Sequence, residues 1–116
     1  MPCPVICWEL LARDLRKQQD FFGRLFDWEI SGKPGQNWAS VATGMADGTI
    51  TQATPPASDI VLTVQVEDVA ATVDKAIRLG ARVVNPPAPY PDGSMASLIR
   101  DPEGNLLWVS KPPAGS

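Results

Sequence analysis

The first half of the chain changes from a strand-like to a helix-like pattern and back. A mostly apolar run at 5–11 predicts a strand, and apolar residues spaced three and four apart over 15–26 predict an amphipathic helix. Asp14 directly precedes that helix, where its carboxylate can accept a backbone amide of the first turn. Three short strands are predicted to follow, at 28–30, 37–43 and 49–53, separated by loops or turns that contain glycine.

The second half repeats this order after a linker at 54–58. We predict a strand at 60–66, a helix at 69–79, a strand at 82–85, a proline-rich loop at 86–92, and strands at 94–100 and 106–110. Asp68 stands at the N-cap position that Asp14 occupies in the first half, and Gly80 stands where a helix C-cap glycine belongs. The sequence therefore predicts a repeated βαβββ unit. Module 1 spans about 5–54 and module 2 about 59–110, with a tail at 111–116, all within a single domain covering 1–116.

Composition and charge exclude several classes of function. The chain has 13 acidic and 10 basic residues, and the basic residues are scattered, so nucleic acid is not an expected partner. It has no histidine, which excludes Ser-His and Cys-His nucleophile pairs and every metal site that needs a histidine ligand. No apolar run approaches the ~18 residues of a membrane span, and the N-terminus does not resemble a signal peptide.

The two cysteines, Cys3 and Cys7, are expected to be unpaired. In an extended strand their Cα atoms would lie ~13 Å apart, and a disulfide tolerates at most about 7 Å. Reduced thiols are typical of the cytoplasm, which is the expected location.

Three groups of residues carry a resemblance to a known family. They are CWEL at 7–10 with LFDWE at 25–29, VQVEDV at 64–69, and the turn DPEGN at 101–105. Together with the repeat, these segments resemble the glyoxalase-like proteins of the vicinal oxygen chelate superfamily, which includes bleomycin-resistance proteins and extradiol dioxygenases. The resemblance covers about residues 5–110. It implies an α+β fold in which two tandem βαβββ modules form curved mixed sheets around a cavity, with the helices on the outer face.

The resemblance also implies where a metal would be held in the enzymes of this superfamily. The four ligand positions, on the first and fourth strands of each module, fall near Cys7, Gln52, Val61 and Trp108. Val61 has no ligating atom, and the indole of Trp108 offers only an N–H donor. Cys7 and Gln52 alone do not make a zinc, iron or manganese site. We therefore expect no metal and no other cofactor.

Strand parity predicts which side chains face the cavity. Leu62, Val64 and Val66 form a uniformly apolar set that should pack on the helix at 69–79, which leaves the alternating positions 61, 63 and 65 for the cavity. The predicted binding residues are Cys7, Gln52, Val61, Thr63, Gln65 and Trp108, with Glu9 as the candidate catalytic residue.

Glu9 is the strongest candidate for chemistry. Its carboxylate lies in mid-strand, where partial burial favours the protonated form and suits a general base. The alternative is a solvated or hydrogen-bonded structural carboxylate. Cys7 has no histidine to activate it and is better read as a small buried hydrophobe. Trp38 and Trp108 are either cavity walls or core, and Tyr90 either closes over a pocket or belongs to a loop that covers the sheet end.

The sequence favours binding of a small-molecule ligand in the cavity without metal. Two alternatives stay open: a metal-independent isomerase or lyase that uses Glu9 as its base, and a non-catalytic subunit that binds a partner protein. A homodimer is expected, because the family commonly dimerises and open sheet edges invite a partner.

Overall fold

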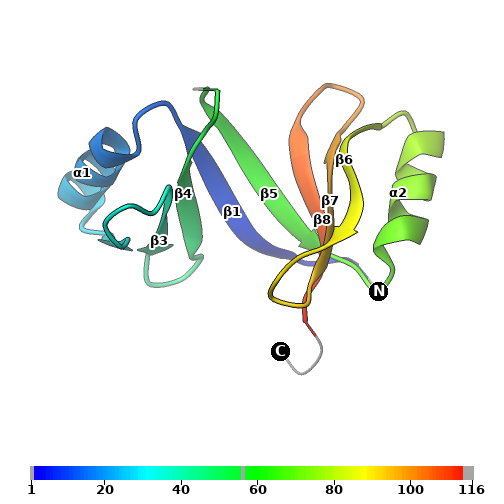
Figure 1. The fold of residues 1–116 in the computed structure, drawn as a ribbon, viewed down its shortest axis with the longest axis horizontal. Helices are drawn as coiled ribbons and strands as arrows, with labels where there is room; N and C mark the ends of the chain where they lie inside the picture. Colours follow the sequence, from blue (N-terminus) through cyan, green and yellow to red (C-terminus); the bar gives the residue numbers. More distant parts are fainter. Residues whose placement is uncertain (1, 56, 114–116) are drawn as a thin grey trace. The chain divides into compact units, whose positions relative to one another are not determined.

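Two βαβββ sequences follow one another along the chain (Figure 1), in a computed structural model that describes residues 2–55 and 57–113. The first comprises β1 (Val5–Ala12), α1 (Leu15–Phe26), β2 (Glu29–Ser31), β3 (Trp38–Ala42) and β4 (Gly48–Gln52). The second comprises β5 (Asp59–Gln65), α2 (Val69–Arg78), β6 (Arg82–Pro89), β7 (Met95–Arg100) and β8 (Leu106–Lys111). The predicted α+β class and the repeat are confirmed. Pro56 of the predicted linker and residues 114–116 of the predicted tail lie outside the described residues.

The chain divides into two compact units. The N-terminal unit is Cys7–Ile60, and the C-terminal unit combines the residues up to Ile6 with the chain from Val61 onward. Each unit contains one helix and most of one four-strand set, so each is described by itself. The single domain predicted over 1–116 stays a prediction.

In the N-terminal unit, the strands lie in the order β2-β3-β4-β1, and β1 runs parallel to β4. The sheet buries one face against α1, around a cluster of Ala12, Leu15, Ala39, Val41 and Ile50. Trp8 and Leu10 of β1 pack against this cluster. The helix starts where predicted, because the Asp14 carboxylate accepts a hydrogen bond from the amide of Lys17 at 3.2 Å.

The C-terminal unit repeats this arrangement, with strand order β5-β8-β7-β6 and β5 parallel to β8. Its helix α2 covers one face of the strands (Figure 1) over a cluster of Val66, Val69, Val73, Ile99 and Val109. Asp68 caps α2 by accepting a bond from the amide of Ala71 at 3.0 Å. Gly80 follows the helix with φ of 104°, a left-handed conformation that glycine adopts without steric cost.

The proline-rich segment corrects the sequence prediction. The predicted strand at 82–85 continues to Pro89 as β6, so most of the predicted loop at 86–92 is strand. Proline cannot donate to a sheet ladder, but β6 is an edge strand and its pairing with β7 has register shifts between Val83 and Ala88. A pattern rule that treats proline as a loop signal therefore ended this strand too early. At the other end of the chain, β8 includes Lys111, which was predicted to begin the tail.

Two smaller expectations concern the thiols and the membrane. Cys3 and Cys7 are both free thiols, as predicted. Within residues 2–55 and 57–113, neither helix is long and apolar enough to cross a membrane.

Candidate functional site

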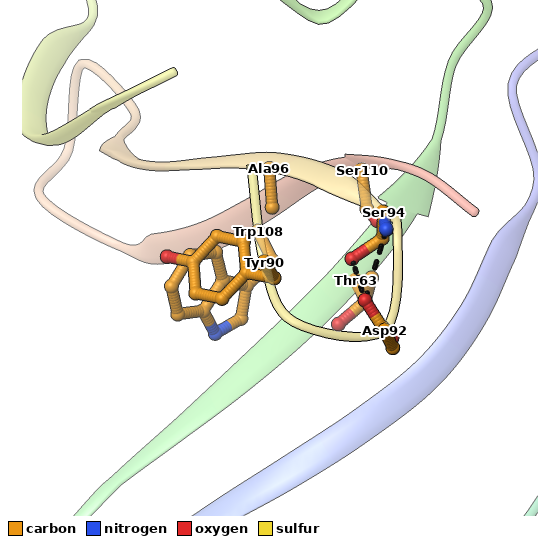
Figure 2. Close-up of a pocket in the computed structure, with 7 residues that line it drawn as sticks. All are labelled: Thr63, Tyr90, Asp92, Ser94, Ala96, Trp108 and Ser110. Atoms are coloured by element: carbon orange, nitrogen blue, oxygen red, sulfur yellow. Dashed lines mark hydrogen bonds between the residues drawn. The ribbon is translucent and has the colours of Figure 1, made fainter. Parts of the chain in front are cut away.

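The C-terminal unit contains a pocket on the sheet face opposite α2. The side chains of Leu107 and Val109 pack toward the helix cluster, so Trp108 and Ser110 point to the other face. The pocket has a volume of about 210 Å³. Figure 2 shows the residues that line it, which are Thr63, Tyr90, Asp92, Ser94, Ala96, Trp108 and Ser110.

Strand register builds the floor of this pocket. Trp108 lies at the centre, paired with Thr63 of β5 on one side and with Leu98 of β7 on the other. Ser110 and Ala96 form the next pair along the same face. The strand β8 pairs in parallel with β5 and antiparallel with β7. This pairing brings the hydroxyls of Thr63 and Ser110 next to the indole of Trp108.

One wall of the pocket is aromatic. The ring of Tyr90 meets the indole of Trp108 edge to face, with centroids 6.0 Å apart and an interplanar angle of 87°. This geometry is a favourable one for an aromatic pair. Tyr90 remains 37% exposed, so its ring is accessible to a ligand.

The turn between β6 and β7 forms the rim. The amide of Tyr90 donates to the carbonyl of Ser94 at 2.9 Å, and the amide of Gly93 donates to the carbonyl of Tyr90 at 2.9 Å. Asp92 Oδ1 accepts from both the amide and the hydroxyl of Ser94, at 2.9 and 2.6 Å. These bonds to Ser94 hold the pKa of the Asp92 carboxyl below its usual value. Gly93 has φ of 90°, so the turn needs glycine there.

Thr63 and Trp108 were predicted as binding residues, and both line the pocket. Gln65 follows Thr63 on the same face of β5 but is not part of the lining. Val61 also lies on that face, but its side chain is apolar and only 1% exposed. Whether any of these residues binds a ligand stays a prediction.

Sequence analysis missed four lining residues: Asp92, Ser94, Ala96 and Ser110. Parity along the last strand could have found Ser110, because it lies two residues after Trp108. Asp92 and Ser94 reach the pocket because hydrogen bonds shape the β6–β7 turn, and an alternating strand pattern does not predict such a turn.

Glu9 lies in the N-terminal unit, on the face of β1 opposite Trp8 and Leu10, as its parity predicted. Its Oε2 accepts a hydrogen bond from the hydroxyl of Thr51 at 2.8 Å, and the contact is partly buried. Burial, and secondarily the neighbouring Glu9 charge, raise the pKa of the Cys7 thiol. Cys7 therefore stays protonated at neutral pH, which disfavours a nucleophilic role.

The predicted position of Gln52 on the same face of the sheet as Glu9 is wrong, although Gln52 lines a hollow beside Asp14 and Asn37 and its role in binding stays a prediction. Gln52 shares its face of β4 with Ile50, as expected, but Ile50 is buried in the cluster beneath α1. The Gln52 side chain accepts from the amide of Leu15 at 3.0 Å and donates to the carbonyl of Arg13 at 2.9 Å. It also donates to the carbonyl of Ala12 at 3.2 Å. Its amide thus fixes the β1–α1 connection and lies on the helix side of the sheet.

Trp38 is 40% exposed and lines a separate cleft of the N-terminal unit, beside Arg16, Lys33 and Gln36. The cleft has a volume of about 120 Å³. Trp38 and Trp108 therefore lie in different hollows, in different units.

Comparison with known proteins decides the family. A family model described as a glyoxalase-like domain matches residues 6–110. The chain belongs to the glyoxalase-like family. The comparison with curated protein sequences gave no match.

Solved structures share the glyoxalase-like fold at low sequence identity. A glyoxalase/bleomycin resistance protein/dioxygenase superfamily member from Vibrio splendidus is 16% identical with a TM-score of 0.69, covering 96% of this chain and 99% of its own. A hypothetical protein from Bacillus halodurans is 10% identical with a TM-score of 0.71, covering 100% and 99%. A methylmalonyl-CoA epimerase variant from Streptomyces coelicolor, in complex with 2-nitronate-propionyl-CoA, is 12% identical with a TM-score of 0.61, covering 96% and 95%.

The metal positions implied by the glyoxalase-like resemblance do not fit a metal here. In the N-terminal unit the Gln52 oxygen already accepts the Leu15 amide, which leaves Cys7 as the one implied position there whose side chain could ligate a metal. In the C-terminal unit, Val61 has no ligating atom and Trp108 offers an N–H. Within the described residues, no three Cys, Asp or Glu side chains gather closely enough to hold a metal ion.

Proposed function

We propose that this glyoxalase-like protein binds a small aromatic molecule in the pocket of its C-terminal unit. The observation that carries the proposal is the edge-to-face pair of Tyr90 and Trp108 beside a group of hydroxyls. Ligand pockets commonly combine an apolar or aromatic wall with a few fixed polar groups. Structures with the same fold hold small molecules, as the epimerase complex does.

The dimensions of the pocket limit the ligand. The volume of about 210 Å³ is smaller than the ~300 Å³ at the lower end of typical drug-sized sites. A single-ring compound suits this space, with its ring against Tyr90 and Trp108 and a polar substituent near Thr63 or Ser94.

We also propose that binding needs no metal ion. Val61 and Trp108 cannot ligate a metal, the Gln52 amide is already used, and the Cys7 thiol alone does not make a metal site. Recognition therefore rests on ring contacts and hydrogen bonds. A ligand of this kind binds in buffer that contains a chelator as well as it binds without one.

Saturation-transfer NMR with indole and phenethyl alcohol tests this function. Both compounds should show binding to the wild-type protein in the presence of EDTA, and Trp108→Leu should abolish it because the central ring contact is lost. Trp38→Leu is the matched control, since it makes the same substitution at a tryptophan that lines a different cleft. Equal binding by wild type and Trp108→Leu, or binding that EDTA removes, would contradict the proposal.

A second candidate function, proton transfer by Glu9, is favoured by the Thr51 hydrogen bond. A carboxylate held by a hydroxyl at 2.8 Å is oriented, which a general base requires. If the protein is a metal-independent isomerase or lyase, Glu9→Gln should abolish turnover while Thr51→Val lowers it. Tight binding of a ligand with no conversion by the wild type would favour the binding function instead.

A further inference from the structure

The rim of the C-terminal pocket carries a single carboxylate. Asp92 is the only charged residue among the seven that line the pocket. Its Oδ1 is held by the amide and hydroxyl of Ser94, which fixes the side chain beside the hydroxyls of the pocket (Figure 2). The same turn positions Tyr90, since the Tyr90 amide bonds to the Ser94 carbonyl at 2.9 Å. The carboxylate and the aromatic ring are thus carried by one hydrogen-bonded turn.

In the part of the chain that the structure describes, no cation forms an ion pair with this carboxylate. Among residues 2–55 and 57–113, the ion pair that the structure contains is Arg24 with Asp20 on α1. The bonds from Ser94 favour the ionised form of Asp92, so the group is negative at neutral pH. A ligand therefore meets a fixed negative charge at this edge of the pocket.

The opposite wall also favours positive charge. The faces of Tyr90 and Trp108 carry negative electrostatic potential, which attracts ammonium groups within about 6 Å of the ring centroid. The hydroxyls of Thr63, Ser94 and Ser110 can accept hydrogen bonds from an amine. No lining residue is basic, so an anionic ligand would find no partner charge there.

We propose that the pocket selects aromatic ligands that carry a positively charged amine over neutral or anionic analogues. The ring lies against Tyr90 and Trp108, and the ammonium group lies toward Asp92. This inference rests on the proposed binding function and specifies its ligand class.

The test compares three probes that share a phenyl ring: phenethylamine as the cation, phenethyl alcohol as the neutral analogue and hydrocinnamate as the anion. Dissociation constants are measured by ligand-observed NMR for the wild type and for Asp92→Asn. Asparagine retains an Oδ1 acceptor for Ser94, so the turn should be preserved. Asp101→Asn is the matched control, because Asp101 also accepts backbone amides in a turn of the same unit, at 2.9 Å, but lies outside the pocket.

The expected order of affinity is amine, then alcohol, then carboxylate. Because Asp92 is exposed, the amine should bind roughly two- to fivefold more tightly than the alcohol at low salt, and added salt should reduce this ratio. Asp92→Asn should remove the preference, and Asp101→Asn should keep it. If Asp92→Asn unfolds the turn, the salt dependence of the wild type decides the question.

The outcomes distinguish a failure of this inference from a failure of the proposed binding of aromatic molecules. Alcohol binding without an amine preference, or a preference that survives both Asp92→Asn and high salt, overturns the inference and leaves the aromatic site. Failure of all three probes to bind overturns both.

Discussion

Replacing Gln52 by methionine tests whether this residue, at an implied metal-ligand position, is structural. Methionine keeps a similar length but removes the amide, so the Leu15 N–H loses its acceptor at 3.0 Å and the Arg13 carbonyl loses its donor at 2.9 Å. The Ala12 carbonyl still accepts from the Ala53 amide at 2.9 Å, so its loss is small.

The expected cost follows from these bonds. An unsatisfied, partly buried donor costs about 1–3 kcal/mol, and the half-exposed position of Gln52 favours the middle of that range, about 2 kcal/mol. With a urea m value of roughly 1.5 kcal/mol/M for a chain of this size, the unfolding midpoint should fall by about 1.3 M. Gln19→Met is the control, because no hydrogen bond joins the Gln19 side chain to the described residues; its midpoint should stay near the wild type.

The assay is urea denaturation followed by circular dichroism, together with binding of indole. The reasoning predicts a lower midpoint, an unchanged m value and unchanged affinity for indole. A midpoint equal to that of the wild type, combined with loss of binding, would show that Gln52 is a ligand-contacting residue and refute the structural role.

Three further predictions concern stability and assembly. Gly48→Ala should lower the free energy of unfolding by roughly 1–3 kcal/mol, because a Cβ there would overlap Trp8. Gly23→Ala should raise it by about 0.5–1 kcal/mol, because the nearest atom to a Cβ there is 3.8 Å away. Equal melting temperatures of the two variants and the wild type would contradict this. Hydrogen bonds lower the pKa of Asp92 and of Asp101. The stability that these two carboxylates add to the folded protein should therefore be fully present above about pH 4 and fade as the pH falls through the lowered pKa values. Urea midpoints of the wild type and of both Asp→Asn variants, measured between pH 5 and pH 2, check this, and identical pH profiles would refute it. Sedimentation equilibrium should give twice the 12.5 kDa chain mass, and a constant 12.5 kDa at micromolar concentration would reject the homodimer.

Local signals in the sequence were sufficient to predict most of the fold. The helix at 15–26 was predicted with its observed bounds, because its apolar spacing and the Asp14 cap are both encoded within a few residues. The glycine of the DPEGN turn, Gly104, has φ of 92°, the left-handed conformation for which a turn favours glycine. Parity also placed Thr63 on the pocket face, and the family resemblance placed Trp108 there.

Long-range contacts account for what the sequence could not predict. Gln52 reads as a polar cavity residue, and only the approach of β4 to the start of α1 shows that its amide is used by Leu15. Pro86 and Pro87 read as a loop, although an edge strand accommodates them. Asp92 gains its place in the pocket from a turn whose geometry depends on the pairing of β6 with β7.

The most direct test of the central claim is a ¹H–¹⁵N NMR titration of the protein with phenethylamine in buffer containing EDTA. We predict saturable shifts of the Trp108 indole N–H and of the backbone amides of Tyr90 and residues 92–96, with the indole N–H of Trp38 unchanged. No shifts at saturating ligand, or shifts confined to other parts of the chain, would contradict metal-free recognition at the Tyr90–Trp108 pocket.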